Sequence, residues 1–417
     1  MNTSAPIDTV CVIGLGYIGL PTAAVLAQSG KTVIGVDVDP ASVDAVNTGS
    51  VLFVEEGLST VVAGAVARGR LRAQANTPPA DAYIVAVPTP FREQHDADLS
   101  FIEAAARDIA PQLTGGELIV LESTSPPGTT EHMAEVILEI RPELTREPSL
   151  PNSLYFSHAP ERVLPGRIMI EMVDNDRIIG GLTPEAAERT RDLYSSFCRG
   201  ELLLTDARTA EMAKLTENAF RDVNIAFANE LSLIAERQGI DVWELIRLAN
   251  HHPRVNILQP GPGVGGHCIA VDPWFIVSAD RENSRLIATA RHVNDAKPEF
   301  VIGKALEQAR RFVNPTVAAL GITFKANVDD LRGSPAKDIV HALARELTDG
   351  TILVVEPNIP ELPPSFDGVV GVELTDLDDA VSRADVVLLL VDHDPFTTFD
   401  TAKLEGKAVI DTRGLWR

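Results

Sequence analysis

The sequence predicts an α/β protein in which two parallel-sheet units are joined by a helical segment. A short apolar strand, a glycine-rich turn and a helix follow one another near the start, and strands alternate with helices again in the last third. Such alternation is typical of parallel sheets with helices on their faces. Between these parts, residues 208–238 contain no proline or glycine and are rich in alanine, glutamate and leucine, which predicts one long helix.

Length and composition limit the class of protein. The 417 residues exceed what one core usually fills, and we place domains at 1–205, 206–300 and 301–417. The net charge of −23 disfavours nucleic acid as a partner. No apolar run is long enough to span a bilayer, and the first ten residues do not resemble a signal peptide. We therefore expect a cytoplasmic protein that binds neither nucleic acid nor membranes.

The three cysteines predict neither disulfides nor a metal site. Cys11, Cys198 and Cys268 lie far apart, at no spacing typical of zinc ligands. So few cysteines fit a reducing compartment. Two adjacent histidines, His251 and His252, could suggest metal or base chemistry, but no third ligand accompanies them.

A glycine-rich turn follows the first expected strand. Residues 9–13 are apolar, and Gly14, Gly16 and Gly19 then lead into a helix-like stretch at 20–29. In a dinucleotide site, the first glycine permits the tight turn, the second lets the pyrophosphate approach, and the third lets helix and strand pack. The helix N-terminus supplies amide donors for phosphate. A turn of this kind without a ligand is the alternative interpretation.

The second expected strand, residues 32–36, ends at an acidic residue. Asp37 stands where a carboxylate can accept hydrogen bonds from ribose hydroxyls. No basic residue occurs between Lys31 and Arg68, so a 2′-phosphate would meet Asp37 and Asp39 without a compensating cation. We therefore expect NAD, not NADP, as the cofactor.

Polar turns follow two later expected strands, residues 83–87 and 118–121. Thr89 follows the first, and Thr124 and Thr130 follow the second. Doubly wound sheets bind ligands at this carboxyl edge, where a hydroxyl can donate to a cofactor. Ordinary turn chemistry is an equal alternative.

Charged residues gather at two further places. Glu161 and Arg162 are adjacent in a turn, where their pairing could be a salt bridge or part of a substrate wall. On the long helix, Lys214, Asn218 and Arg221 share one face. A solvated stripe is the usual explanation of such a face. Apolar residues surround these polar groups, however, so the helix could instead line a site or contact another subunit.

A glycine-rich loop, residues 261–275, carries the third cysteine. Four glycines precede Cys268, and Asp272 follows it by four residues. Glycines at this density let the backbone approach a ligand closely. Cys268 could therefore be a nucleophile, with a buried structural thiol as the alternative.

The last third of the chain predicts a second α/β unit. We expect strands at 316–321, 351–355, 384–391 and 408–411, and Pro335 is well placed to begin a helix. Lysine and arginine residues near the strand ends suit a second anion, such as a diphosphate.

Eight stretches of the sequence have characteristic wording: GLGYIGLP, VPTP, ESTSPPGT, APERVLPG, RTAEMAKLTENAFRDVNIAFANE, HPRVNILQPGPGVGGHCIAVDPWF, TFKANVDDLRGSP and VVEPNI. In them the chain resembles the UDP-glucose/GDP-mannose dehydrogenase family over essentially its whole length. The resemblance implies an N-terminal Rossmann NAD-binding domain and a central long-helix domain that carries the catalytic loop and forms a homodimer. It also implies a C-terminal Rossmann-like domain that binds a nucleotide sugar, here a UDP-sugar.

The resemblance also implies a four-electron oxidation at the sugar C6, through a thiohemiacetal and a thioester on Cys268. Lys214 and Asn218 would stabilise the developing alkoxide. Candidates for positioning the hydrolytic water are Asp272, Glu161 and Thr124.

Binding roles follow from the same resemblance. The UDP-sugar site would include Arg162, Val163, Lys214, Asn218, Arg221, Gly265, Phe324, Lys325 and Arg413, with His252 and Arg254 reaching it from a partner subunit. The cofactor site would include Gly14, Gly16, Tyr17, Ile18, Gly19, Asp37, Thr89, Thr124, Thr130 and Arg332.

The wording of the glycine loop bears on the substrate. Ala270 and Trp274 favour the branch of the family that oxidises UDP-N-acetyl-D-mannosamine to UDP-N-acetyl-D-mannosaminuronate, a precursor for polysaccharide biosynthesis. UDP-N-acetylglucosamine and UDP-glucose are the alternative substrates. A non-catalytic sensor on the same fold is a further alternative, which the joint presence of Cys268, Lys214 and Asp272 disfavours.

Overall fold

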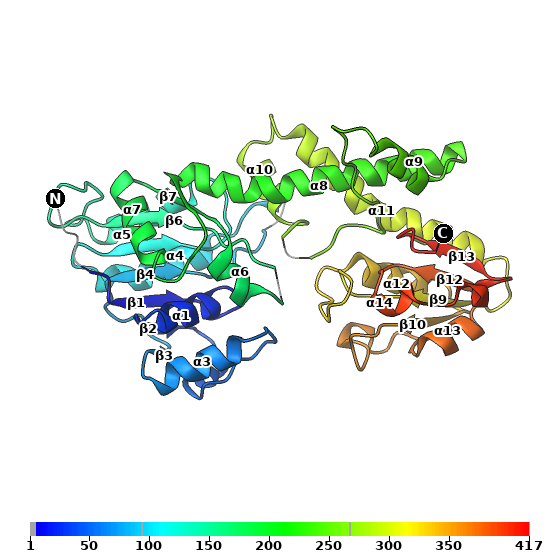
Figure 1. The fold of residues 1–417 in the computed structure, drawn as a ribbon, viewed down its shortest axis with the longest axis horizontal. Helices are drawn as coiled ribbons and strands as arrows, with labels where there is room; N and C mark the ends of the chain where they lie inside the picture. Colours follow the sequence, from blue (N-terminus) through cyan, green and yellow to red (C-terminus); the bar gives the residue numbers. More distant parts are fainter. Residues whose placement is uncertain (1–5, 93–94, 165, 267, 417) are drawn as a thin grey trace. The chain divides into compact units, whose positions relative to one another are not determined.

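The structure, a computed structural model, describes residues 6–92, 95–164, 166–266 and 268–416. The chain divides into two compact units (Figure 1). The N-terminal unit consists of Met1–Thr216 with Trp274–Ala279, and the C-terminal unit of Glu217–Pro273 with Asp280–Arg417. No helix of the described residues combines the length and the apolar character needed to cross a membrane.

The described part of the N-terminal unit is organised around an eight-stranded sheet with the order β3-β2-β1-β4-β5-β6-β7-β8. Neighbouring strands are parallel except for β6 and β7, which pair antiparallel. The strands are β1 (Thr9–Ile13), β2 (Thr32–Val36), β3 (Leu71–Gln74), β4 (Ala82–Val85), β5 (Leu118–Leu121), β6 (Tyr155–His158), β7 (Arg177–Gly181) and β8 (Leu202–Asp206). The bounds predicted for β1, β2 and β5 are confirmed, and β4 ends two residues earlier than predicted.

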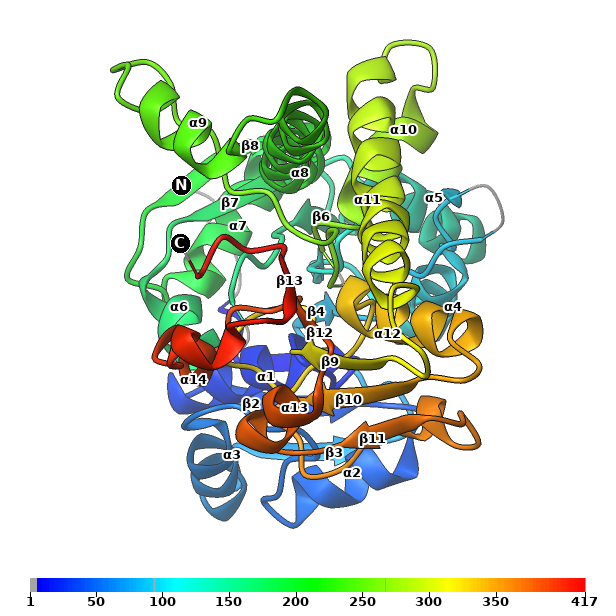
Figure 2. The same ribbon diagram turned by 90° about the vertical axis from the view of Figure 1, so that its right-hand side faces the viewer.

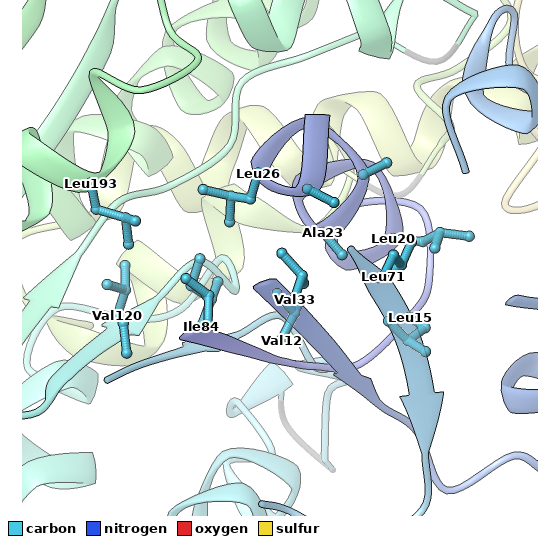
Figure 3. Close-up of a cluster of buried hydrophobic side chains, with 14 of the residues drawn as sticks. Val12, Leu15, Leu20, Ala23, Leu26, Val33, Leu71, Ile84, Val120 and Leu193 are labelled. Carbon is cyan, nitrogen blue, oxygen red and sulfur yellow. The ribbon is translucent and has the colours of Figure 1, made fainter. Parts of the chain in front are cut away.

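Both faces of this sheet are buried. Alternate residues of a strand point to opposite faces, so the residues of each face pack into a separate apolar cluster. Val10 and Val12 of β1 belong to one apolar cluster, and Cys11 and Ile13 belong to another. The first cluster includes residues of α1 (Gly19–Gln28), α3 (Leu58–Ala67) and α7 (Pro184–Tyr194). Figure 3 shows part of it, with Leu20, Ala23 and Leu26 of α1 beside strand residues. The second cluster includes residues of α4 (Ser100–Ile109) and α5 (Thr129–Ile140).

The described part of this unit also contains short helices. These are α2 (Pro40–Asn47), α6 (Ile168–Asp174), the 3-10 helix η2 (Ala110–Gln112) and α10 (Asp272–Ala279), whose first two residues belong to the C-terminal unit.

The predicted long helix is confirmed as α8 (Ala207–Gln238), which begins in the N-terminal unit and continues into the C-terminal unit. It ends at Gly239, whose φ of +67° favours glycine. The next helix, α9 (Val242–Ala249), starts after Asp241, whose carboxylate accepts hydrogen bonds from the backbone of Trp243 and Glu244 as an N-cap.

The described part of the C-terminal unit contains a five-stranded parallel sheet with the order β11-β10-β9-β12-β13. Figure 2 shows this unit facing the viewer. The strands are β9 (Thr316–Leu320), β10 (Thr351–Val355), β11 (Val372–Leu374), β12 (Val386–Leu389) and β13 (Ala408–Asp411). This order makes the unit a second doubly wound sheet, as predicted.

Helices cover both faces of the second sheet. One apolar cluster includes residues of α11 (Arg285–Ala309) and α12 (Pro335–Glu346), and the other includes residues of α13 (Leu377–Arg383) and α14 (Asp394–Thr397). Two 3-10 helices complete the unit, η3 (Pro364–Phe366) and η4 (Thr401–Leu404). Pro335 begins α12, as predicted.

Two strand predictions in this unit were too long. The predicted strand 384–391 is β12 over Val386–Leu389, because Ala384 caps α13 and both Leu390 and Val391 donate to the same carbonyl, that of Leu320. The predicted strand 316–321 ends at Leu320, since Gly321 turns with a φ of +84°.

Candidate active site

The glycine turn after β1 has the geometry of a dinucleotide site. Gly14 has a φ of +90°, and a Cβ there would lie 2.5 Å from the carbonyl oxygen of Ala86. A Cβ on Gly19 would lie 1.8 Å from the carbonyl oxygen of Gly14, so only a glycine lets the helix start this close to the turn. At Gly16 a Cβ would meet no atom within 4 Å, which leaves open space above the backbone. The residues present therefore fit a pyrophosphate.

The two residues inside the turn have different surroundings. Tyr17 is partly exposed and stacks on Phe53, with 4.2 Å between ring centroids. Ile18 precedes α1 at the N-cap position. Both residues therefore lie at the turn, for which a cofactor role is predicted.

Asp37 fixes the turn from the end of β2. Its Oδ2 accepts from the N–H of Leu15 at 2.8 Å, and its Oδ1 accepts from the N–H of Asp39 at 2.9 Å. The carboxylate is thus tied to the turn while each oxygen keeps a second lone pair for a ribose hydroxyl.

The hydroxyl residues at the carboxyl edge do not behave alike. The hydroxyl of Thr89 donates to the carbonyl of Thr124 at 2.5 Å, which brings the turns after β4 and β5 together. Thr130 is fully buried, and both its N–H and its hydroxyl donate to Glu211 of α8, at 2.7 and 2.6 Å. The structure therefore places Thr130 among the contacts that join α5 to α8. Sequence reasoning missed Glu211 as this partner, because 81 residues separate the pair.

Glu161 belongs to a buried group of two carboxyls and one guanidinium. It forms an ion pair with Arg177 at 2.5 Å and accepts from the N–H of Arg162 at 2.8 Å. Glu122 lies 4.0 Å from Arg177 and accepts from the hydroxyls of Tyr194 and Thr22. Burial raises the pKa of Glu122 to about 7, although Arg177 opposes the shift.

The turn after β6 differs from the predicted pairing in one respect. The salt bridge of Glu161 is formed with Arg177, 16 residues later, whereas the guanidinium of Arg162 donates to the carbonyl of Asp176. Val163 is partly buried and packs against the apolar cluster of Val25, Ile168 and Met172. Arg177 gave no sequence signal, since it lies inside a strand.

Lys214 is largely buried in the N-terminal unit, with 8% of its surface exposed. Its charge acts on His158, a fully buried residue at the end of β6. Burial, together with the positive charge of Lys214, lowers the pKa of His158 to about 3. A solvated stripe therefore does not describe this part of α8.

In the C-terminal unit, a buried polar network holds the glycine loop. The N–H of Gly261 donates to Asn229 of α8 at 2.9 Å, and the amide of Asn229 donates to Asn294 of α11 at 2.9 Å. Asn294 donates to Asp222, which forms an ion pair of 2.6 Å with Arg291. The polar groups on this part of α8 are therefore bonded to α11 and the loop.

The same loop packs against the segment after β9. A Cβ on Gly265 would lie 2.4 Å from the carbonyl oxygen of Gly333 and 3.3 Å from the Cβ of Phe324. A Cβ on Gly261 would lie 2.7 Å from a guanidinium nitrogen of Arg413. The structure thus places Phe324 beside Gly265, and Arg413 beside Gly261 at the start of the same loop.

Cys268 is exposed, so the interpretation as a buried structural thiol is wrong for this cysteine. Its carbonyl accepts from the N–H of Val271 and Asp272, one turn before α10, where helix dipoles favour negative charge. The amide of Asn218 donates to the Asp272 carboxylate at 2.5 Å. Cys11 and Cys198 are buried, and burial raises the pKa of the Cys11 thiol to about 12.

The basic residues predicted for ligand binding are spread over the C-terminal unit. Arg413 donates to Asp392 at 2.9 Å, and the guanidinium of Arg332 donates two hydrogen bonds to Asp330. Exposed side chains are those of Arg221 on α8, His252 and Arg254 after α9, and Lys325 after β9. Arg332 and Gly333 lie beside the glycine loop, because the N–H of Gly266 donates to the carbonyl of Gly333.

Trp274 has a packing role. Its ring stacks on His95 at 4.2 Å between centroids, and Phe275 contacts Phe91 at 5.0 Å. These contacts join α10 to the loop after β4 within the N-terminal unit.

The chain belongs to the UDP-glucose/GDP-mannose dehydrogenase family. Residues 8–198 match the NAD binding domain of that family, residues 208–296 its central domain, and residues 318–417 its UDP binding domain. The predicted resemblance, the three-part α/β fold and the use of NAD are confirmed, and the protein is an NAD-dependent dehydrogenase of nucleotide sugars.

Individual relatives cover nearly the whole chain. An NDP-N-acetyl-D-galactosaminuronic acid dehydrogenase of Ralstonia nicotianae is 56% identical, covering 100% of this chain and 98% of its own length. A UDP-N-acetyl-D-mannosamine dehydrogenase of Escherichia coli K12 is 52% identical, covering 98% and 99%.

Solved structures agree with these relatives. A UDP-D-ManNAc dehydrogenase from Pyrococcus horikoshii has a TM-score of 0.85 at 37% identity and covers 98% of this chain and 96% of its own. An NDP-N-acetyl-D-galactosaminuronic acid dehydrogenase from Methanosarcina mazei has a TM-score of 0.82 at 29% identity, with coverage of 99% and 92%.

Proposed function

We propose that this protein oxidises the C6 alcohol of UDP-N-acetyl-D-mannosamine to the carboxylate, giving UDP-N-acetyl-D-mannosaminuronate. The observation that carries the proposal is the exposed Cys268, held on a glycine loop one turn before α10 and four residues before Asp272, whose carboxylate accepts from the amide of Asn218. A two-electron alcohol oxidation would not require this thiol.

The reaction balances as two oxidations and one hydrolysis. Bound NAD supplies the acceptor for each of two hydrides. The alcohol first loses a hydride and a proton to give an aldehyde, and the thiolate of Cys268 adds to its carbon to form a thiohemiacetal. Loss of the second hydride leaves a thioester, and one water then releases the carboxylate and regenerates the thiol. Each uronate therefore corresponds to two NADH.

The remaining catalytic residues keep the roles proposed from the sequence. Lys214 and Asn218 stabilise the alkoxide, and Asp272 takes up a proton or orients water. Glu161 acts as a hydrogen-bond acceptor in this scheme, held in place by its ion pair with Arg177. Thr124 positions the hydrolytic water.

Each unit has its own binding residues in this proposal. In the N-terminal unit, the glycine turn, Asp37 and Thr89 bind NAD, and Arg162 and Val163 keep the substrate-binding role that the family resemblance implies. The C-terminal unit binds the UDP-sugar through Gly265, Phe324, Lys325 and Arg413, consistent with its match to a UDP binding domain. Arg332 contacts the cofactor, and Arg221 contacts the sugar nucleotide.

The relatives support two sugars. The mannosamine enzymes of enteric bacteria are about half identical to this chain, and the galactosaminuronic acid enzyme of Ralstonia is 56% identical. Trp274, one of the two residues that favour mannosamine in the sequence, stacks its ring on His95. UDP-N-acetyl-D-galactosamine is therefore the second candidate, beside UDP-N-acetylglucosamine and UDP-glucose.

The test is to incubate the purified protein with NAD and each of these four UDP-sugars, and to measure NADH and uronate. Two NADH per uronate, with UDP-N-acetyl-D-mannosamine giving the highest kcat/KM, is the expected result. Preference for the galacto epimer would move the substrate assignment and leave the chemistry unchanged. Binding without turnover of any of the four would contradict the proposal in favour of a sensor.

The proposal includes a homodimer formed through α8. Three apolar residues recur on this helix at intervals of seven, Phe220, Phe227 and Ile234, and they are 71%, 53% and 51% exposed. Residues seven apart lie near one face of a helix, and such a stripe is typical of a helix that packs on a partner. In the dimer, His252 and Arg254 would reach the site of the partner subunit. A cytoplasmic location, where NAD and nucleotide sugars are consumed for polysaccharide biosynthesis, completes the proposal.

A further inference from the structure

A buried imidazole and carboxylate lie beneath the segment that is proposed to bind the nucleotide. His393 and Glu356 are 0% and 4% exposed, and each follows a central strand of the second sheet, β12 and β10. Beside them, residues 321–330 follow β9 and contain Phe324 and Lys325. We call residues 321–330 the nucleotide loop.

Glu356 binds the start of this loop. Its Oε2 accepts from the backbone N–H of Ile322 at 2.8 Å and of Thr323 at 3.2 Å. Burial alone would raise the pKa of Glu356, but the hydrogen bonds from His393 and from Ile322 lower it. The carboxylate is therefore ionised and anchors two successive amides.

His393 binds the middle of the loop, and the contacts fix its tautomer. Its Nδ1 lies 3.0 Å from the backbone nitrogen of Asn327, which can only donate, so Nδ1 must carry the lone pair. The proton is then on Nε2, which donates to Glu356 at 3.0 Å. Thr323 also lies 3.2 Å from Nε2, and its hydroxyl donates to the carbonyl of Lys325 at 2.9 Å.

The loop needs this anchor because its backbone is strained. Asn327 has a φ of +60°, which a residue with a side chain rarely adopts. Its amide donates to Asp394 at 2.8 Å, and its side-chain oxygen accepts from the N–H of Asp394 at 3.0 Å. Both the backbone and the side chain of Asn327 are thus bound to the start of α14.

We propose that His393 and Glu356 are positioning residues for nucleotide binding: they hold the nucleotide loop in the conformation that binds uridine diphosphate. The proposal rests on the proposed role of Phe324 and Lys325 in the UDP-sugar site. Neither residue is a catalytic residue, since both are buried and their hydrogen-bonding atoms are occupied by the loop, by each other and by Asn358. They therefore affect how tightly the protein binds the nucleotide.

Two substitutions separate the two contacts of the imidazole. In His393→Asn, the amide oxygen takes the place of Nδ1 and can still accept from Asn327. In His393→Gln, the amide nitrogen takes the place of Nε2 and can still donate to Glu356, but the N–H of Asn327 is left without its acceptor. The matched control is His341→Gln on α12, whose ring stacks on Phe366 in the same unit.

The test measures binding of UDP alone by titration calorimetry, and KM and kcat with the UDP-sugar and with NAD. We expect His393→Gln to raise the Kd for UDP and the KM for the UDP-sugar by about tenfold or more, because an unpaired buried donor costs that much. His393→Asn should recover most of this loss. The KM for NAD and the control should change less than about twofold.

The outcomes distinguish this inference from the proposed function. Wild-type protein that does not bind UDP would contradict the proposed site itself. Wild-type binding with an unchanged Kd for His393→Gln would overturn the role of His393, and so would a fall in kcat with an unchanged KM.

A measurement on the unaltered protein covers the case in which the variants do not fold. Nitrogen-15 NMR of histidine-labelled protein should show His393 as a neutral ring with the proton on Nε2, both with and without UDP. A ring that carries its proton on Nδ1 in the UDP-bound protein would contradict the anchor.

Discussion

Asp37 connects the glycine turn to the choice of cofactor. Its two oxygens accept from Leu15 and Asp39, so the carboxylate is fixed and negatively charged where a ribose would bind. A 2′-phosphate at that place would meet this charge without a cation, because no basic residue occurs between Lys31 and Arg68.

Asp37→Asn should therefore weaken NAD binding and narrow the preference over NADP. We expect the KM for NAD to rise by about tenfold, since a charge-assisted hydrogen bond is lost, while the KM for NADP falls or stays the same. Asp39→Asn is the matched control for the KM for NAD, because Asp39 caps α2 and an asparagine caps equally well. Equal changes in both KM values would contradict the role of Asp37.

Glu122 makes the stability of the folded protein fall as the pH rises. Its pKa is raised from 4.5 to about 7, so between these values the native state holds a proton that the unfolded chain has lost. The stability from this group is therefore present below about pH 4.5 and is lost as the pH rises to about 7, a change of roughly 2–3 kcal/mol between pH 5 and pH 8.

Glu122→Gln should remove this pH-dependent contribution to the free energy of unfolding. Between pH 5 and pH 8, the melting temperature of wild-type protein should fall relative to that of the variant. The comparison with the variant cancels the contributions of other groups to the pH dependence. One of these is His158, whose lowered pKa of about 3 makes its contribution to stability rise with pH. Parallel melting curves for the two proteins over this pH range would show that Glu122 is ionised in the native state.

Among single residues, the sequence predicts a functional role only where neighbouring residues in the chain indicate one. Asp37 ends a strand after a glycine turn, and Cys268 follows a run of glycines. Arg177, Glu211 and His393 carry no such signal. Their partners are 16, 81 and 37 residues away, and only the folded chain brings them together.

The bounds of helices and strands could be predicted where the apolar run ends at the same residue as the strand or helix. The bounds of β1, β2, β5, β10 and β13 and the start of α12 are confirmed. Strand ends at β9 and β12 were missed, since Gly321 and the residues after Leu389 leave the ladder while remaining apolar. The bonding of Asn229 to the glycine loop could not be read from the helix alone.

The glycine loop depends on close packing at Gly265. A side chain there would collide with the carbonyl of Gly333 at 2.4 Å and with Pro335 at 2.6 Å, neither of which can move freely. Gly265→Ala should lower kcat/KM for the UDP-sugar by about tenfold or more, because loop displacement costs binding and alignment together.

A matched glycine serves as the control for this element. Gly303 is exposed on α11, and a Cβ there would meet no atom within 4 Å. Gly303→Ala should leave activity unchanged and stabilise the helix by about 0.5–1 kcal/mol. Normal activity in Gly265→Ala would mean that the loop tolerates displacement.

For the whole molecule, the exposed stripe on α8 predicts the oligomeric state. Wild-type protein should be a dimer by light scattering, and Phe227→Glu should shift it toward monomer, because a buried charge without a partner is costly. Val313→Glu, at a residue that is 92% exposed before β9, should remain dimeric. A monomeric wild-type protein would contradict the dimer.

The central claim is that the thiol of Cys268 carries the aldehyde through the second oxidation and the hydrolysis to the acid. The most direct measurement is the amount of NADH and of uronate formed from UDP-N-acetyl-D-mannosamine by wild-type protein and by Cys268→Ser. We predict two NADH per uronate for the wild type and no uronate released by the variant. Uronate formation by Cys268→Ser at the wild-type rate would remove Cys268 from the reaction and contradict the account.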